Sequence, residues 1–134
     1  MQTMKPPKSS AKIIWTYGAI CGVCFSILWL IFEHLVTSNT TGGTIWTTLR
    51  TSSMGVSFLV AGILASKQTG RVRTGMMAGL VTGLIAGIII SAVDMLVTRP
   101  SLGFILIVVL ALVAGAVIGE MGGLIGYRQY SKES

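Results

Sequence analysis

The fold of this chain is decided by residues 75–91, GMMAGLVTGLIAGIIIS. A small residue recurs there at every fourth position, namely Gly75, Gly79, Gly83, Gly87 and Ser91. Residues four apart lie on the same face of an α-helix, so the spacing predicts a helix with one narrow small-residue stripe. No charge falls between Arg73 and Asp94, which leaves this helix long and apolar enough to cross a bilayer.

A second stripe follows in the apolar segment 102–127. It consists of Ala111, Gly115, Gly119 and Gly123 at the same spacing, with Gly122 and Gly126 beside them. Lipid is as apolar as a leucine side chain, so membrane helices associate through close backbone contact between small residues rather than through hydrophobic burial. The two stripes therefore predict glycine-zipper packing, either between two helices of one chain or between two copies.

The composition of the whole chain is that of a membrane protein. Of its 134 residues, 52% are hydrophobic and 10% are charged, whereas a soluble domain carries about 25% charged residues. The mean hydropathy is +0.81. These values exclude an ordinary water-soluble enzyme, a disordered chain and a disulfide scaffold.

Four apolar segments predict four transmembrane helices. Their expected bounds are 13–36, 46–66, 75–97 and 102–127. The second segment is uncharged only over Met54–Ala65, so it reaches the roughly 20 residues of a span only if residues 46–53 are also helical.

Short connections between these segments place consecutive helices side by side and antiparallel. We therefore expect an all-α integral membrane bundle of four transmembrane helices, up-down-up-down, over residues 13–127. Residues 1–12 and 128–134 form the two tails.

Basic residues predict the orientation of this bundle. Eight of the ten fall at one end, namely Lys5, Lys8, Lys12, Lys67, Arg71, Arg73, Arg128 and Lys132. Only Arg50 and Arg99 fall at the other end. By the positive-inside rule, both termini are cytoplasmic in a multi-pass protein of the plasma membrane. Membrane topology accounts for the positions of the basic residues, which do not gather on one face of a folded domain. We therefore expect no nucleic-acid partner.

Ionisable residues within membrane spans are costly and are candidate functional groups. The candidates are Glu33, His34, Arg50, Asp94 and Glu120. Glu33 lies roughly 31 Å beyond Lys12, and Asp94 roughly 31 Å beyond Arg73, by helical rise. Both reach the outer edge of the hydrocarbon, beside His34 and at the level of Arg50. We predict a polar layer in which Arg50 pairs with Asp94 or Glu33; the alternative is an interfacial network that only anchors helix ends.

Glu120 is separate from this layer. It precedes Arg128 by roughly 12 Å of helical rise and lies at the edge of the glycine face, beside Gly123. Such a carboxylate serves either as a proton or cation site, or as a structural group that bonds to a partner helix or to a basic side chain at the cytoplasmic surface.

The chain resembles small bacterial four-helix membrane proteins of uncharacterised function. The resemblance rests on a short second span containing Ala61-Gly62, a basic loop with Gly70, the GMMAGL motif that begins at Gly75, and the glycine-rich segment 119–126. It covers roughly residues 55–127. It implies the same four-helix fold and brings no activity with it.

These features predict a structural or accessory role. The protein would act in the lipid bilayer by helix packing, as a homo-oligomer or as a subunit of a larger membrane complex. The alternative is a small oligomeric transporter or channel for protons, ions or small solutes that uses Glu120 and the Glu33/Asp94/Arg50 layer. No enzyme activity, catalytic residue, cofactor or metal is expected. The only CxxC motif, Cys21–Cys24, lies within the first span, where we interpret both cysteines as packing residues.

The predicted pairing of Arg50 has a direct test. Arg50→Ala is expected to destabilise the wild-type protein by at least about 0.5 kcal/mol more than it destabilises an Asp94→Asn variant, because the interaction is already lost in the latter. Thermal unfolding of the four proteins of this cycle in detergent measures the difference. Equal effects in both backgrounds would mean that the two side chains do not interact.

Overall fold

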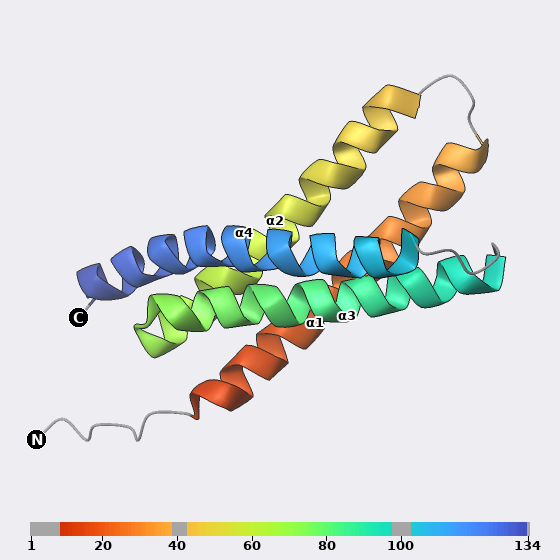
Figure 1. The fold of residues 1–134 in the computed structure, drawn as a ribbon. Helices are drawn as coiled ribbons and strands as arrows, with labels where there is room; N and C mark the ends of the chain where they lie inside the picture. Colours follow the sequence, from red (N-terminus) through yellow and green to blue (C-terminus); the bar gives the residue numbers. More distant parts are fainter. Residues whose placement is uncertain (1–8, 39–42, 98–102, 134) are drawn as a thin grey trace, which may run out of the picture.

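The computed structural model describes residues 9–38, 43–97 and 103–133, and these form four α-helices. The helices are α1 (Ser10–Ser38), α2 (Gly43–Thr69), α3 (Val72–Val97) and α4 (Gly103–Glu133). Successive helices run in opposite directions, and the α1–α2 hairpin lies obliquely across the α3–α4 hairpin (Figure 1). The predicted all-helical class with four helices is therefore confirmed.

Three of the helices are long and apolar enough to cross a membrane. The qualifying segments are Ser10–His34, Val72–Val93 and Val108–Lys132. Residues 46–53 are helical, as the second span requires, but α2 does not qualify. The physical reason is its first half, where residues 47–53 read TTLRTSS.

The helices extend beyond the predicted spans at the basic end of the molecule. α2 continues to Thr69 and α3 begins at Val72, so the connection between them is a tight turn. Gly70 has a φ of +64°, and its N–H donates to the Ser66 carbonyl over 2.8 Å. This left-handed glycine is the usual C-terminal cap of a helix. Lysine, glutamine and arginine are good helix formers, which explains why helix continues through the basic residues on either side.

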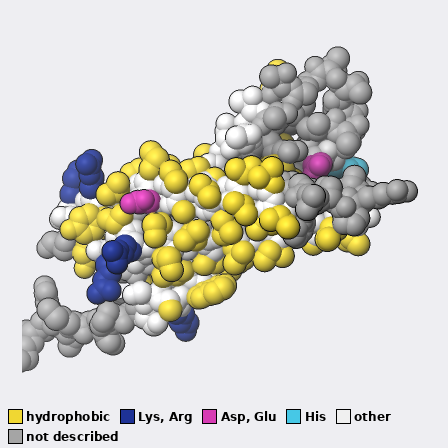
Figure 2. Space-filling model, viewed as in Figure 1, with side chains coloured by type: hydrophobic (Ala, Val, Ile, Leu, Met, Phe, Trp, Pro, Cys, Tyr) yellow, Lys and Arg dark blue, Asp and Glu magenta, His cyan; other side chains and the backbone are white. Residues whose placement is uncertain are grey.

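Small side chains fill the interior, while large apolar side chains cover the outside. The fully buried residues include Ala61, Ala65, Ala78 and Ala86 together with Ser26, Ser66 and Thr82. Figure 2 shows an outer surface dominated by hydrophobic side chains. The large apolar side chains that are more than half exposed include Ile27, Ile88, Leu110 and Val117. A water-soluble bundle has the reverse arrangement, so this distribution indicates lipid as the surrounding solvent.

Glycines bring the backbones of α3 and α4 together. A Cβ on Gly83 would lie 2.5 Å from the Ala111 carbonyl oxygen, and one on Gly115 would lie 2.5 Å from the Gly79 carbonyl oxygen. Gly75 approaches the Cα of Gly123 in the same way. The small-residue faces of these two helices thus pack against each other within one chain.

α4 also packs against α2 through a second set of glycines. A Cβ on Gly62 would collide with the backbone of Gly119, and a Cβ on Gly122 with the carbonyl of Leu59. A Cβ on Gly126 would meet the Ile63 carbonyl oxygen at 2.5 Å. Helix α4 therefore lies in the groove between α2 and α3.

The first helix contacts the bundle mainly through α3 and α2. Gly18 lies against Val81, and the Thr82 hydroxyl donates to the Gly18 carbonyl over 3.2 Å as well as to its own helix. Toward the outer end, the Phe25 ring lies 5.7 Å from that of Trp29 and 6.3 Å from that of Phe58 on α2, centroid to centroid. Phe25 and Phe58 are the two large apolar side chains that are fully buried among the described residues.

Two glycine-to-alanine substitutions test this packing with opposite signs. Gly83→Ala is expected to lower the free energy of unfolding by about 1–3 kcal/mol, because its methyl group would overlap the Ala111 carbonyl. Gly55→Ala is the matched control: its methyl group would meet only Ile118, at 3.9 Å. Alanine is favoured over glycine inside a helix by about 0.5–1 kcal/mol, so this variant should be more stable than wild type.

Thermal unfolding in mild detergent measures both effects. A Gly83→Ala protein as stable as Gly55→Ala would show that the close approach of α3 and α4 is not required.

Candidate functional site

The predicted polar residues do not form a single site. Glu33 lies near the end of α1, whereas Glu120 lies roughly 26 Å along α4 from its first residue, Gly103, by helical rise. Because α1 and α4 run in opposite directions, Glu33 is close to the outer end of the molecule, whereas Glu120 lies just past the middle of α4 toward the basic end. Figure 2 shows one acidic side chain beside the histidine and another farther along the visible face, among hydrophobic side chains.

At the outer end, Glu33 is held by its own helix. The Trp29 indole N–H donates to the Glu33 carboxylate over 3.2 Å, one helical turn away. Glu33 is half-buried and His34 beside it is exposed. The side chains of Arg50 and Asp94 lie outside the described residues, so their predicted pairing stays a prediction.

Glu120 is exposed on the outer surface of α4. Its neighbours one turn away on that surface are Val117 and Leu124, which are 56% and 51% exposed. The stripe of Gly115, Gly119 and Gly123 is buried, so Glu120 points away from the contact with α3. The carboxylate is thus part of an apolar outer face.

The small-residue stripe of α3 is packed tightly at one end and loosely at the other. Toward the basic end, a Cβ on Gly75 would lie 2.5 Å from the Cα of Gly123; toward the outer end, one on Gly87 would lie 3.5 Å from the Cα of Val108. Beyond Gly87, the Ser91 hydroxyl is buried without a hydrogen-bond partner among the described residues. The two helices therefore separate slightly toward the outer end.

A cavity of about 330 Å³ lies where the helices separate. All four helices contribute to its lining, including Trp29 from α1, Met54 from α2, Ile90 from α3 and Leu110 from α4. Alanines of α3 and α4 and Gly87 complete the wall. The described lining is apolar, and Glu33, His34 and Glu120 do not belong to it.

Two parts of the packing were not predicted from the sequence. The first is the contact of α2 with α4 through Gly62 and Ser66, for which a signal exists because the two small residues are four positions apart. The second is the buried pair Phe25 and Phe58. Nothing in the sequence distinguishes these phenylalanines from lipid-facing ones.

The fold and its surface define a membrane-embedded helical protein. Three helices of spanning length and an apolar outer surface carry this assignment. Within residues 9–38, 43–97 and 103–133, no group of three or more His, Cys, Asp or Glu side chains could hold a metal ion. Comparison with protein-family models, with curated proteins and with solved structures found no match.

Glu33 and Glu120 should act independently because they lie at different levels of the bundle, on α1 and α4, whose described residues do not contact each other. The effects of Glu33→Gln and Glu120→Gln on the free energy of unfolding are expected to add within about 0.5 kcal/mol in the double variant. Thermal unfolding of the two single variants and the double variant measures this. A larger deviation would indicate one connected polar network.

Proposed function

We propose that this chain is a four-span protein of the plasma membrane, with both termini in the cytoplasm and a structural or accessory role. It acts by helix packing with itself or with a larger membrane partner. Three features of the molecule support this proposal: the length and packing of α2, the placement of the basic residues, and the outer face of α4.

The first feature is α2, which we take as a membrane span in addition to α1, α3 and α4. α2 has 27 residues, comparable with the 26 of α3, and it packs between α1 and α4. Its polar first half requires protein or headgroup neighbours. The second half of α2 is buried within the bundle at Phe58, Ala61 and Ser66, which supports crossing rather than surface attachment. In the first half, Thr48, Thr51 and Ser52 are exposed, so headgroups or a partner helix would cover them.

The second feature is the placement of the basic residues, which sets the orientation of the bundle in the membrane. The α2–α3 turn carries Lys67, Arg71 and Arg73, and the end of α4 carries Arg128 and Lys132. In Figure 1 this turn and the end of α4 lie at the same end of the molecule as the start of α1. Basic residues concentrate on the cytoplasmic side of short membrane loops.

The observation that carries the function is the exposed Glu120 on an apolar face of α4. A carboxylate facing lipid costs up to about 2.5–3.5 kcal/mol at the centre of a helix. A neighbouring protein surface that offers hydrogen-bond donors or a cation removes much of that cost. The glycine faces of α3 and α4 occupy each other, so an assembly through α4 would use this outer face.

The alternative is a small oligomeric transporter or channel. In an assembly, Glu120 of each copy would line a path between subunits rather than through one bundle. Flux through the assembly distinguishes this role from a purely structural one.

The test starts from the mass of the complex extracted from native membranes in mild detergent, with its components identified. We expect a particle larger than the 14.1 kDa monomer. Glu120→Gln should reduce the assembled fraction several-fold because the charged contact is lost, whereas Glu120→Asp should retain most of it. A wild-type protein that is monomeric in native membranes would contradict the proposal.

Liposome flux assays then separate the two roles. A homo-oligomer that conducts protons or ions, and loses conduction in Glu120→Gln while staying assembled, would favour the transporter. An assembly without flux would support the structural role.

A further inference from the structure

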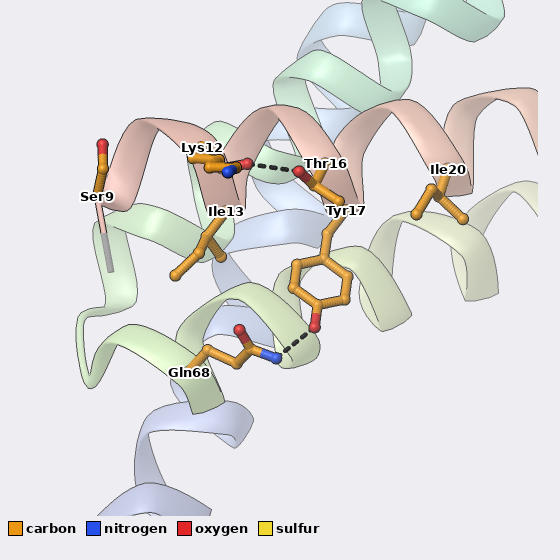
Figure 3. A pocket seen from close by; sticks show the side chains of 7 residues that line it. All are labelled: Ser9, Lys12, Ile13, Thr16, Tyr17, Ile20 and Gln68. Atoms are coloured by element: carbon orange, nitrogen blue, oxygen red, sulfur yellow. Dashed lines mark hydrogen bonds between the residues drawn. The ribbon is translucent and has the colours of Figure 1, made fainter. Parts of the chain in front are cut away.

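A groove of about 550 Å³ lies at the basic end of the molecule, between the start of α1 and the end of α2. It is separate from the apolar cavity, and the described side chains of Glu33, His34 and Glu120 do not line it. Its wall combines Lys12, Thr16 and Tyr17 with Ile13 and Ile20 on α1, and Gln68 stands opposite on α2 (Figure 3).

The polar groups that face this groove are mainly hydrogen-bond donors. The Gln68 amide donates to the Tyr17 hydroxyl oxygen, which leaves the second amide hydrogen and the phenolic hydrogen available to a ligand. Lys12 adds an ammonium group. The Thr16 hydroxyl donates its hydrogen to the Lys12 carbonyl oxygen and is therefore not counted among the free donors. Among the residues that the structure describes, no acidic side chain lines the groove. A set of donors with a positive charge recognises an anion such as a phosphate.

The other half of the groove is apolar. Ile13 is 6% exposed and forms its floor, while Ile20 is 55% exposed and stands at its far end. Lys12 and Ile20 are roughly 12 Å apart along α1 by helical rise. From Lys12 past Tyr17 to Ile20, the lining therefore changes from charged through polar to apolar, in the direction in which a lipid changes from headgroup to acyl chain. A free phosphate ion would leave this apolar half unused.

We propose that the groove binds an anionic phospholipid of the cytoplasmic leaflet. Lys12, Tyr17 and Gln68 hold the phosphate, and the first part of one acyl chain lies along Ile13 and Ile20. Lys67 directly precedes Gln68 and Arg71 lies three residues after it, and both add to the positive potential at this end. The leaflet named here rests on the proposed orientation, whereas the chemistry of the groove does not.

Native mass spectrometry of the full chain tests the proposal. The protein is equilibrated in detergent with equimolar phosphatidylglycerol and phosphatidylcholine that carry the same acyl chains. We expect wild type to retain phosphatidylglycerol in preference. Lys12→Gln should reduce that preference about five-fold, because one lysine near an anionic lipid is lost. Lys12→Arg keeps the positive charge and should retain the preference.

Two further variants make the test specific. Tyr17→Phe removes the hydroxyl without changing charge and should also reduce retention. Lys132→Gln removes the same charge at the same end of the molecule but outside the groove, and should leave the preference unchanged.

Three results would overturn the proposal. The first is an equal loss of the phosphatidylglycerol preference in Lys12→Gln and Lys132→Gln, which would mean that diffuse surface charge attracts the lipid. The second is displacement of the lipid by inorganic phosphate, which would mean a free-anion site. The third is no preference for phosphatidylglycerol in the wild-type protein. The oligomeric mass is recorded in the same spectra, so failure of the lipid site is distinguishable from failure of the proposed assembly.

Discussion

The close approach of α3 and α4 is the contact on which the rest of the structure depends. Carbonyl oxygens of Gly79 and Gly115 each lie where a side chain on the opposite helix would otherwise stand. Dispersion between two backbones replaces the hydrophobic burial that holds a soluble bundle together, because lipid offers no gain for burying leucine. With α4 fixed on α3, its second row of glycines becomes available to α2, and α1 completes the bundle through Gly18 and Thr82.

This mode of packing also explains the distribution of polar groups. Small hydroxyl residues such as Ser26 and Thr82 fit inside because each donates to a carbonyl one turn earlier in its own helix, over 2.8 and 2.9 Å. Larger polar groups stay at the ends or on the outside. Glu33 is met by Trp29 at the outer end, Tyr17 and Gln68 meet at the basic end, and Glu120 is exposed on α4. The chain therefore presents its chemistry at its periphery, where lipids and other proteins reach it.

The proposals for assembly and for lipid binding use different parts of this periphery. Assembly concerns the outer face of α4 around Glu120, and the lipid groove lies between α1 and α2. The contacts among the described residues include none between α1 and α4, so the two surfaces are on separate elements. A partner on one of them leaves the other accessible to lipid.

The sequence by itself determined the helical class, the number of helices and the faces that carry small residues. These follow from local properties: runs of apolar residues set the segments, and a four-residue spacing sets the face. The predicted spans stop at the basic residues, whereas the helices continue past them, as at Thr69, because lysine and arginine end an apolar run without ending a helix.

Only the tertiary structure decided what each face meets. The helical position of Glu120, at the edge of a glycine stripe, is compatible with burial or exposure, and the seating of α4 between α2 and α3 turned it outward. The packing of the start of α1 against the end of α2 likewise created the groove at Tyr17 and Gln68, which are 51 positions apart in the chain. Contacts of that kind depend on how whole helices cross, and a periodicity within one helix carries no information about the crossing.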